Sequence, residues 1–336
     1  MPKKSILSLI IGLILGLILI ALWFSYTEFD QILLRISEVK TALVIRAALA
    51  YVLAYFIRSV RWNLLLRRKL KLSLFRTWLY SMGGNFVNYM IPIRLGELVK
   101  AWFIKRNHSQ AVSSSLPSIF IDKSFDTLGI FFVLIMLPFL AVQLSLPMMV
   151  LLGLLALVFV ISLVIILFAA KEQKRVLGWF EWLLRLFPAK LRIKLQSFID
   201  LFLQGLNIFE HHWSILVAAL ALTAVGILLD GFYFFSLFRA FGLQDSFLIV
   251  LFGYTLINLS YALPQPPAQL GSNEWMMIIV FSIGFGLTKE SASSIMVFAH
   301  LLTALIMSVL GLIAFSFSGY DVVKSIYKDE TTYESN

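Results

Sequence analysis

Long apolar runs constrain this chain more than any other feature of its sequence. Runs of about 18 or more apolar residues recur, and a helix of that length crosses the roughly 30 Å hydrocarbon layer of a membrane. Only 14% of the 336 residues are charged, against about a quarter in soluble domains. A transmembrane β-barrel would need alternating segments of about ten residues, which the sequence lacks. The sequence therefore predicts an all-α polytopic membrane protein.

Six segments are long enough for complete spans, and two others are interrupted. We place the complete spans at residues 5–24, 41–66, 109–143, 146–170, 213–241 and 291–318. Residues 28–40 are amphipathic, which suits a short helix in the membrane interface. Residues 171–212 combine apolar side chains with many lysines and arginines, which favours helices on the cytoplasmic surface.

Basic residues, which give the chain a net charge of +10, cluster beside the apolar segments. The span at 41–66 ends in six of them: Arg58, Arg61, Arg67, Arg68, Lys69 and Lys71. Because basic flanks stay in the cytoplasm, we place this end and both termini there, in a multi-pass protein of the cell (inner or cytoplasmic) membrane. Nucleic-acid binding would need a basic patch interleaved with exposed aromatic residues, so we expect no nucleic-acid partner.

Two breaks inside apolar segments share one motif. PIRLG at residues 92–96 matches PAQLG at residues 267–271, and a glutamate follows each, Glu97 and Glu274. The apolar halves beside each break are too short to cross the membrane. We therefore predict two re-entrant helical hairpins. The first, over residues 73–106, is cytoplasmic because basic residues flank it: Arg76, Lys100, Lys105 and Arg106.

The hairpins divide the chain into two units of the same order and opposite orientation. Residues 41–143 comprise a span, the cytoplasmic hairpin and a span, whereas residues 213–318 comprise a span, an external hairpin (247–287) and a span. Residues 1–40 precede the first unit, 144–212 connect the units, and 319–336 form a cytoplasmic tail. Inverted repeats whose broken helices meet near the membrane midplane are typical of secondary transporters. A chance match of two breaks is the alternative.

The first tip combines groups that suit an anionic headgroup. The helix that restarts after Pro92 would point free N–H groups at the tip, and Arg94 offers a forked donor for phosphate. Glu97 is close enough in sequence to pair with Arg94 or to take a proton, and Asn85 and Asn88 approach from the other half. A phosphate site and an internal Arg94–Glu97 ion pair are both compatible with the sequence.

The second tip carries no arginine. A glutamate inside the membrane is costly unless it is paired or functional, and Glu274 has Arg94 and His300 as candidate partners; a place near the outer surface is the alternative. We expect a headgroup site formed by both tips, from Arg94, Asn85, Asn88, Gly96, Glu97, Gln269, Gly271, Asn273 and Glu274.

Titratable residues in the spans are candidates for a proton or charge relay. They are Asp122, Asp126, Asp230 and His300. Asp122 and Asp126 share a helical face, where like charges are unfavourable unless they are solvated or neutralised. A water-filled vestibule, a proton site and solvation at the helix end all remain open for this pair.

Motifs for covalent, nucleotide or metal chemistry are missing from the sequence. It contains no Walker loop, nucleophile elbow, zinc-protease motif or dinucleotide fingerprint. It also has no cysteine, which excludes disulfides and thiol catalysis. We expect no catalytic residue, no metal and no cofactor, and hence a transporter rather than an enzyme.

The motifs resemble those of a known membrane family. NYMIPIRLGELVKAWFIKR (residues 88–106), IDKSFD (121–126) and LPQPPAQLGSNE (263–274) are similar to the transmembrane region of lysylphosphatidylglycerol synthases, a flippase-like family. The family usually has Gly-Gly where this chain has Ala268-Gln269, and Glu-Arg at Asp122-Lys123. The resemblance implies paired re-entrant helices that handle lipids with charged or polar heads.

Some family members carry a soluble domain that aminoacylates phosphatidylglycerol, and related modules accompany polyprenyl-linked sugar pathways. These 336 residues contain no such domain, so we expect no aminoacylation. We expect a translocase for an anionic phospholipid or a polyprenyl-phosphate lipid, with membrane lipids as its partners. A headgroup transferase and a scaffold for a lipid or glycolipid synthase are the alternatives; a homo-oligomer and a lipid-modifying synthase partner also remain open.

Overall fold

The protein is helical throughout the part of the chain that the computed structural model describes. That part comprises residues 3–67, 70–91, 95–108, 112–134, 212–261 and 265–317, with a few single residues between 157 and 200. Every described element is a helix, which confirms the all-α prediction.

Three helices are long and apolar enough to cross a membrane: α3 (Thr41–Leu66), α10 (Trp213–Ala240) and α13 (Lys289–Phe317). They coincide with three of the six predicted spans. The first predicted span is α1 (Lys3–Tyr26), which meets the short α2 (Phe29–Ser37) at 87°, and this bent pair is a fourth candidate.

The remaining predicted spans are described in part or not at all. Helix α6 (Val112–Leu134) covers the first two thirds of the span predicted at 109–143. The span at 146–170, the amphipathic stretch at 171–212 and the tail at 319–336 lie outside the described residues, apart from single positions.

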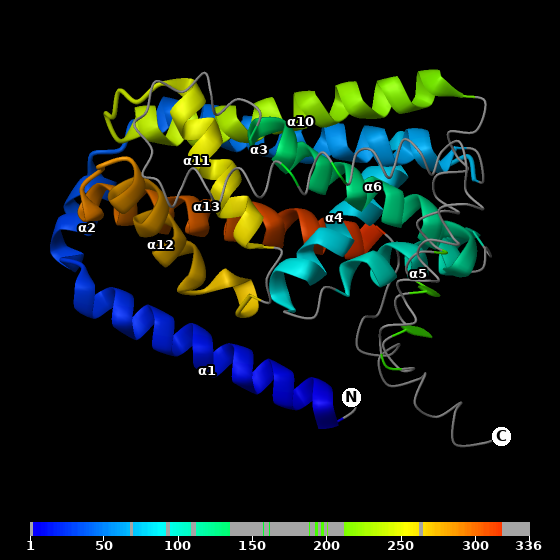
Figure 1. Cartoon of the computed structure of the whole chain (residues 1–336), viewed down its shortest axis with the longest axis horizontal. Helices are drawn as coiled ribbons and strands as arrows, with labels where there is room; N and C mark the ends of the chain where they lie inside the picture. The colour runs from blue at the N-terminus through cyan, green and yellow to red at the C-terminus, as the bar shows by residue number, and fades with distance from the viewer. Residues whose placement is uncertain are drawn as a thin grey trace.

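Helices α3 and α10 lie side by side and antiparallel along one edge of the molecule (Figure 1). Two hydrogen bonds fix their register, from Arg46 Nε to Ser236 Oγ at 3.1 Å and from Arg61 Nη1 to Thr223 Oγ1 at 2.9 Å. The later residue of α3, Arg61, bonds to the earlier residue of α10, Thr223. The pairing therefore gives these two apolar helices opposite directions.

The first break separates α4 (Leu74–Met90) from α5 (Gly96–His108), and the two helices pack against each other as a hairpin. They cross where Gly84 of α4 meets Gly96 of α5. A Cβ atom added at Gly84 would lie 2.7 Å from the carbonyl oxygen of Gly96 and 2.7 Å from Cγ of Lys100. Only glycine permits so close an approach.

The second break follows α11 (Phe247–Ser260). A short 3-10 turn, η3 (Pro267–Gln269), leads into α12 (Ser272–Met277), which continues as the π-helical segment η4 (Ile278–Gly284). The turn is possible because the backbone becomes left-handed at three positions, Ala268 (φ 51°), Gln269 (φ 60°) and Gly271 (φ 77°). Helix α1 packs on this turn.

The helix contacts of the two predicted units correspond to each other. Helix α4 packs on α13, and its counterpart α11 packs on α6. Likewise the contact between α3 and α4 corresponds to the contact between α10 and α11, and the contact between α5 and α6 corresponds to that between α12 and α13. The helices that begin the two hairpins, α4 and α11, are capped in the same way. The side chain of Ser73 accepts a hydrogen bond from the N–H of Arg76, and the side chain of Ser246 accepts one from the N–H of Ile249.

The glycine crossing gives a stability prediction. We expect Gly84→Ala to lower the thermal unfolding midpoint of the detergent-purified protein, because overpacking typically costs about 1–3 kcal/mol. Gly226→Ala is the matched control, since its added Cβ would meet nothing closer than 4.0 Å and alanine favours helix. Equal midpoints for the two variants would contradict the close α4–α5 crossing.

Candidate functional site

A polar cavity of about 340 Å³ lies among the helices. Side chains from α3, α4, α5, α6, α10, α11, α12 and α13 line it, together with the turn before α12. Its described charged residues are Arg58, Glu97, Lys100, Asp122, Lys123, Asp126 and Asp230. Charged groups are rare inside a membrane protein unless they face a cavity or one another, so this is the candidate functional site.

The structure brings most of the predicted site residues together. Nine of the thirteen line the cavity: Asn85, Asn88, Glu97, Asp122, Asp126, Asp230, Gln269, Asn273 and His300. Three more lie directly behind its wall, where Gly96 packs on Gly84, Gly271 packs on Leu19, and Glu274 contacts His300. Arg94 lies outside the described residues, so its role stays a prediction.

At the first tip, Asn88 joins the two half-helices. Its Oδ1 accepts the backbone N–H of Gly96 at 2.7 Å, and its Nδ2 donates to Glu97 Oε1 at 3.1 Å. One of the N–H groups that begin α5 is therefore satisfied by a side chain of α4. This capping orients Glu97 along the cavity wall.

Two arginines of α3 neutralise the aspartates. Arg61, which is 1% exposed, donates from Nε to Asp122 at 2.8 Å and from Nη2 to Asp126 at 2.7 Å. Arg58 forms a two-pronged pair with Asp230, and its Nε lies 3.5 Å from Asp126. The like charges of Asp122 and Asp126 are thus tolerated because arginine neutralises them.

This network corrects one expectation about α3. Arg58 and Arg61 were assigned to a cytoplasmic basic flank, but both side chains point inward, and Arg61 is completely buried. A basic residue near the end of a span is predicted to lie at the membrane surface unless its acidic partner is known. The partners lie on α6 and α10, which are far away in sequence.

Lys100 was also assigned to a basic flank, and it too lies inside. It is 7% exposed and lines the cavity. Within the described part of the chain its ammonium group has no ion pair and no hydrogen bond. It lies over the ring of Trp62, 5.4 Å from the ring centre, and within electrostatic range of Asp122 and Glu97. Lys100 lies three residues after Glu97, which places both side chains on one face of the helix. This spacing was the feature of the sequence that could have placed Lys100 inside.

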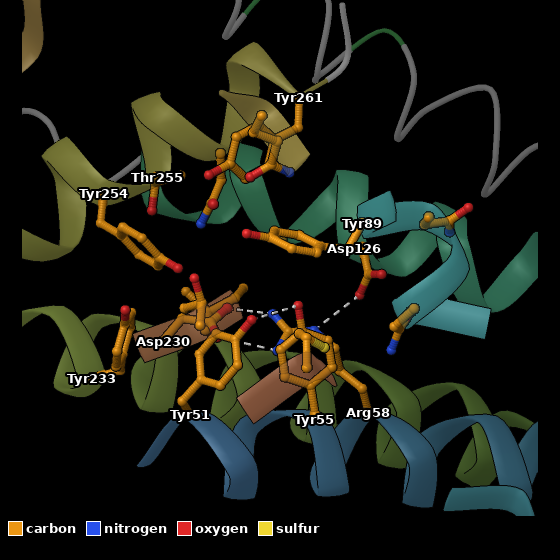
Figure 2. A pocket seen from close by; sticks show the side chains of 18 of the residues that line it. Tyr51, Tyr55, Arg58, Tyr89, Asp126, Asp230, Tyr233, Tyr254, Thr255 and Tyr261 are labelled. Atoms are coloured by element: carbon orange, nitrogen blue, oxygen red, sulfur yellow. Dashed lines mark hydrogen bonds and ion pairs between the residues drawn. The ribbon is translucent and has the colours of Figure 1, made fainter. Parts of the chain in front are cut away.

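Tyrosines form a feature that the sequence did not predict. Six of the eleven in the chain line the cavity: Tyr51, Tyr55, Tyr89, Tyr233, Tyr254 and Tyr261. Figure 2 shows that they enter from different sides, with Tyr51 and Tyr55 on α3 facing Tyr254 and Tyr261 at α11. Their hydroxyl groups can donate to or accept from a polar ligand.

At the second tip, Glu274 pairs with His300, one of its two predicted partners. His300 Nδ1 lies 2.6 Å from Glu274 Oε1, and His300 Nε2 lies 2.7 Å from the carbonyl oxygen of Ala268. Trp275 Nε1 donates to the carbonyl oxygen of Leu19 at 2.9 Å, which ties the tip to α1. Two oxygens here, Asn273 Oδ1 and Glu274 Oε2, are buried without a hydrogen-bond partner among the described residues.

The described residues contain no group of three potential metal ligands from histidine, cysteine, aspartate and glutamate. The cavity therefore offers ammonium, amide, hydroxyl and carboxylate groups for binding. Such groups suit an ionic or polar organic ligand.

Helices long and apolar enough to cross a membrane, packed around a charged and tyrosine-rich cavity, define an integral membrane protein with a polar interior site. The chain belongs to the family of the lysylphosphatidylglycerol synthase transmembrane region, whose sequence model matches residues 7–311. This confirms the resemblance of the motifs at the two breaks.

Two relatives are similar over most of their length and a third over a short part of its length. UPF0104 membrane protein PH1989 of Pyrococcus horikoshii is 26% identical over 330 residues, 92% of this chain and 95% of that protein. UPF0104 membrane protein MJ1078 of Methanocaldococcus jannaschii is 22% identical over 247 residues, 73% of this chain and 97% of the relative. Glycosyltransferase AglD of Haloferax volcanii is 27% identical over 127 residues, 37% of this chain and 20% of AglD.

A water-filled cavity predicts a contrast between two positions of α13. Thr303 lines the cavity, whereas Leu305 is 63% exposed on the outer apolar surface. Because the chain has no cysteine, single-cysteine variants give an unambiguous signal. We expect a charged maleimide to label Thr303→Cys in proteoliposomes and to leave Leu305→Cys, which faces lipid, unlabelled. The opposite pattern would show a dry interior.

Proposed function

We propose that this protein is a lipid translocase that moves an anionic phospholipid or a polyprenyl-phosphate-linked lipid between leaflets. One observation carries the proposal: Lys100 is buried at the wall of the cavity and forms no ion pair or hydrogen bond with the described residues. A buried charge that lacks a partner is costly. A bound phosphate would remove that cost.

The size of the cavity supports a headgroup as its occupant. About 340 Å³ is at the lower end of the range for small-molecule sites. This volume suits a phosphate with a polar substituent, whereas acyl or prenyl tails would remain in lipid. Large apolar side chains, such as Leu301 and Leu305 of α13, are exposed on the outer surface, where they would contact those tails.

The charges around the cavity favour an anion at Lys100 in particular. Arg58 and Arg61 are bound to aspartates, and Lys123 lies 3.4 Å from Asp126. Lys100 alone among these described cations has no such partner. In the proposed complex its ammonium group binds the phosphate, and the tyrosine hydroxyls and Asn85 bind the rest of the headgroup.

The proposed architecture is an inverted repeat. Helices α4 and α5 form a re-entrant hairpin from the cytoplasm, and α11 and α12 form one from outside, with both termini in the cytoplasm and the protein in the cell membrane. The antiparallel α3–α10 pair and the matching contacts of the two units support this arrangement. Lys123, whose side chain is 49% exposed, would mark the mouth of the cavity.

The alternatives are less well supported by the site. A headgroup transferase would need a free carboxylate as its base, but Asp126 is held by Arg61 and Glu97 accepts a hydrogen bond from Asn88. A scaffold for a synthase would have no need of buried charges, which are expensive in a membrane.

Reconstitution with a lysine variant tests the proposal. We expect Lys100→Met to slow transfer of headgroup-labelled phosphatidylglycerol across liposomes by about ten- to a hundredfold, because a hydrogen bond to a charged group contributes about 1.5–3 kcal/mol. Lys105→Met is the matched control, since Lys105 lies on the same helix but is exposed.

Transfer would be measured by chemical quenching of the outer leaflet, with protein-free vesicles as the baseline. Folding of both variants would be checked by their thermal unfolding midpoints. Wild-type transfer no faster than the baseline for a panel of anionic and polyprenyl-phosphate lipids would refute the proposal. Equal rates for the two variants would remove Lys100 from the site.

A further inference from the structure

We infer that Glu274 and His300 together form a binding site for one exchangeable proton, and that this site couples proton movement to the second hairpin tip. The existence of the proton site follows from the geometry of the pair. Its use in lipid transfer rests on the proposed function.

The hydrogen bonds of His300 fix the number of protons in the pair. A carbonyl oxygen only accepts, so the 2.7 Å contact with Ala268 places a proton on His300 Nε2. The 2.6 Å contact between Nδ1 and Glu274 Oε1 needs a second proton, because an unprotonated ring nitrogen and a carboxylate are both acceptors. That second proton belongs to either atom, and in both forms the pair has no net charge.

Burial explains why this proton matters. The side chains of His300 and Glu274 are 9% and 5% exposed, so little water reaches them. Loss of the shared proton would leave a net negative charge and two acceptors 2.6 Å apart, which repel each other. The contact would then have to open. A proton that leaves would pass to water in the cavity, which His300 lines.

Three of the four acidic residues that line the cavity lack this property. Asp122, Asp126 and Asp230 are bound by Arg58 or Arg61, and arginine does not release its proton in proteins. These three aspartates are therefore neutralised without a proton. Among the described acidic residues of the site, Glu274 alone is paired with a side chain that titrates near neutral pH.

The groups around the pair are neutral. Tyr89 of α4 has its ring 6.3 Å from that of His300, and Tyr261 at the end of α11 lies within electrostatic range of Glu274; tyrosine is uncharged near neutral pH. Helix α1 presents Leu19 and Ile20 to the tip, and the adjoining η4 segment contains no titratable residue. The charged residues that share the cavity are Arg58, Glu97, Lys100, Asp122, Lys123, Asp126 and Asp230.

The same pair holds the tip in shape. His300 binds the carbonyl oxygen of Ala268, which together with Gln269 has a left-handed backbone that non-glycine residues rarely adopt. Gln269 lines the cavity and accepts a hydrogen bond from Asn273 at 3.0 Å. Release of His300 would therefore free a strained turn at the cavity wall. Pro266 of that turn packs on Gly16 of α1, which would move with it.

Nitrogen-15 NMR of the histidines tests the proton site without any transport assay. The chain has four histidines, so His300→Gln identifies the signal of His300. We expect protons on both nitrogens of His300, or one on Nε2 and a strongly hydrogen-bonded Nδ1. In Glu274→Gln we expect Nδ1 to lose that signature, whereas Glu290→Gln, the same change outside the cavity, should leave it unaltered. An unprotonated Nε2, or no change in Glu274→Gln, would overturn the proton site.

A pH gradient across phosphatidylcholine vesicles with labelled phosphatidylglycerol tests the coupling. We expect the gradient to change the wild-type transfer rate severalfold, to act equally on Glu290→Gln, and to have no effect on Glu274→Gln. An equal response of wild type and Glu274→Gln overturns the coupling, as does a wild type that ignores the gradient. Absence of any wild-type transfer refutes the translocase and the coupling, while the NMR result still decides the proton site.

Discussion

The pairing of two arginines, Arg61 buried and Arg58 partly buried, with three aspartates holds the rest of this structure in place. Arg58 and Arg61 extend from α3 to Asp230 on α10 and to Asp122 and Asp126 on α6. Breaking a buried pair of this kind costs about 3–5 kcal/mol, because the remaining charge is left uncompensated. The network therefore joins three helices at one depth and fixes the wall from which the cavity is built.

Around that wall, the two hairpin tips have different chemistry. The first presents Asn88 and Glu97, with Lys100 one turn further along α5. The second presents the Glu274–His300 pair and a left-handed turn. In the proposed translocase the first tip binds an anion and the second responds to a proton. The two predicted units would thus differ in the function of their tips.

The apolar runs and the two breaks were sufficient to predict much of this fold. Helices α3, α10 and α13 follow directly from hydropathy, and the Pro-x-x-Leu-Gly motifs marked the positions at which helices end and restart. Arg58, Arg61 and Lys100 were misassigned because a basic residue near a membrane surface and one inside a cavity look alike in sequence. The tyrosines could not be predicted either, since they converge from four helices and follow no shared spacing.

A structure of the protein in lipid nanodiscs that contain phosphatidylglycerol is the most direct test of the central claim that the cavity holds a lipid headgroup. The account predicts phosphate density within hydrogen-bonding distance of Lys100 Nζ, with tail density leaving between helices toward the bilayer. A cavity that contains only water, with Lys100 paired to a carboxylate of the protein, would contradict it.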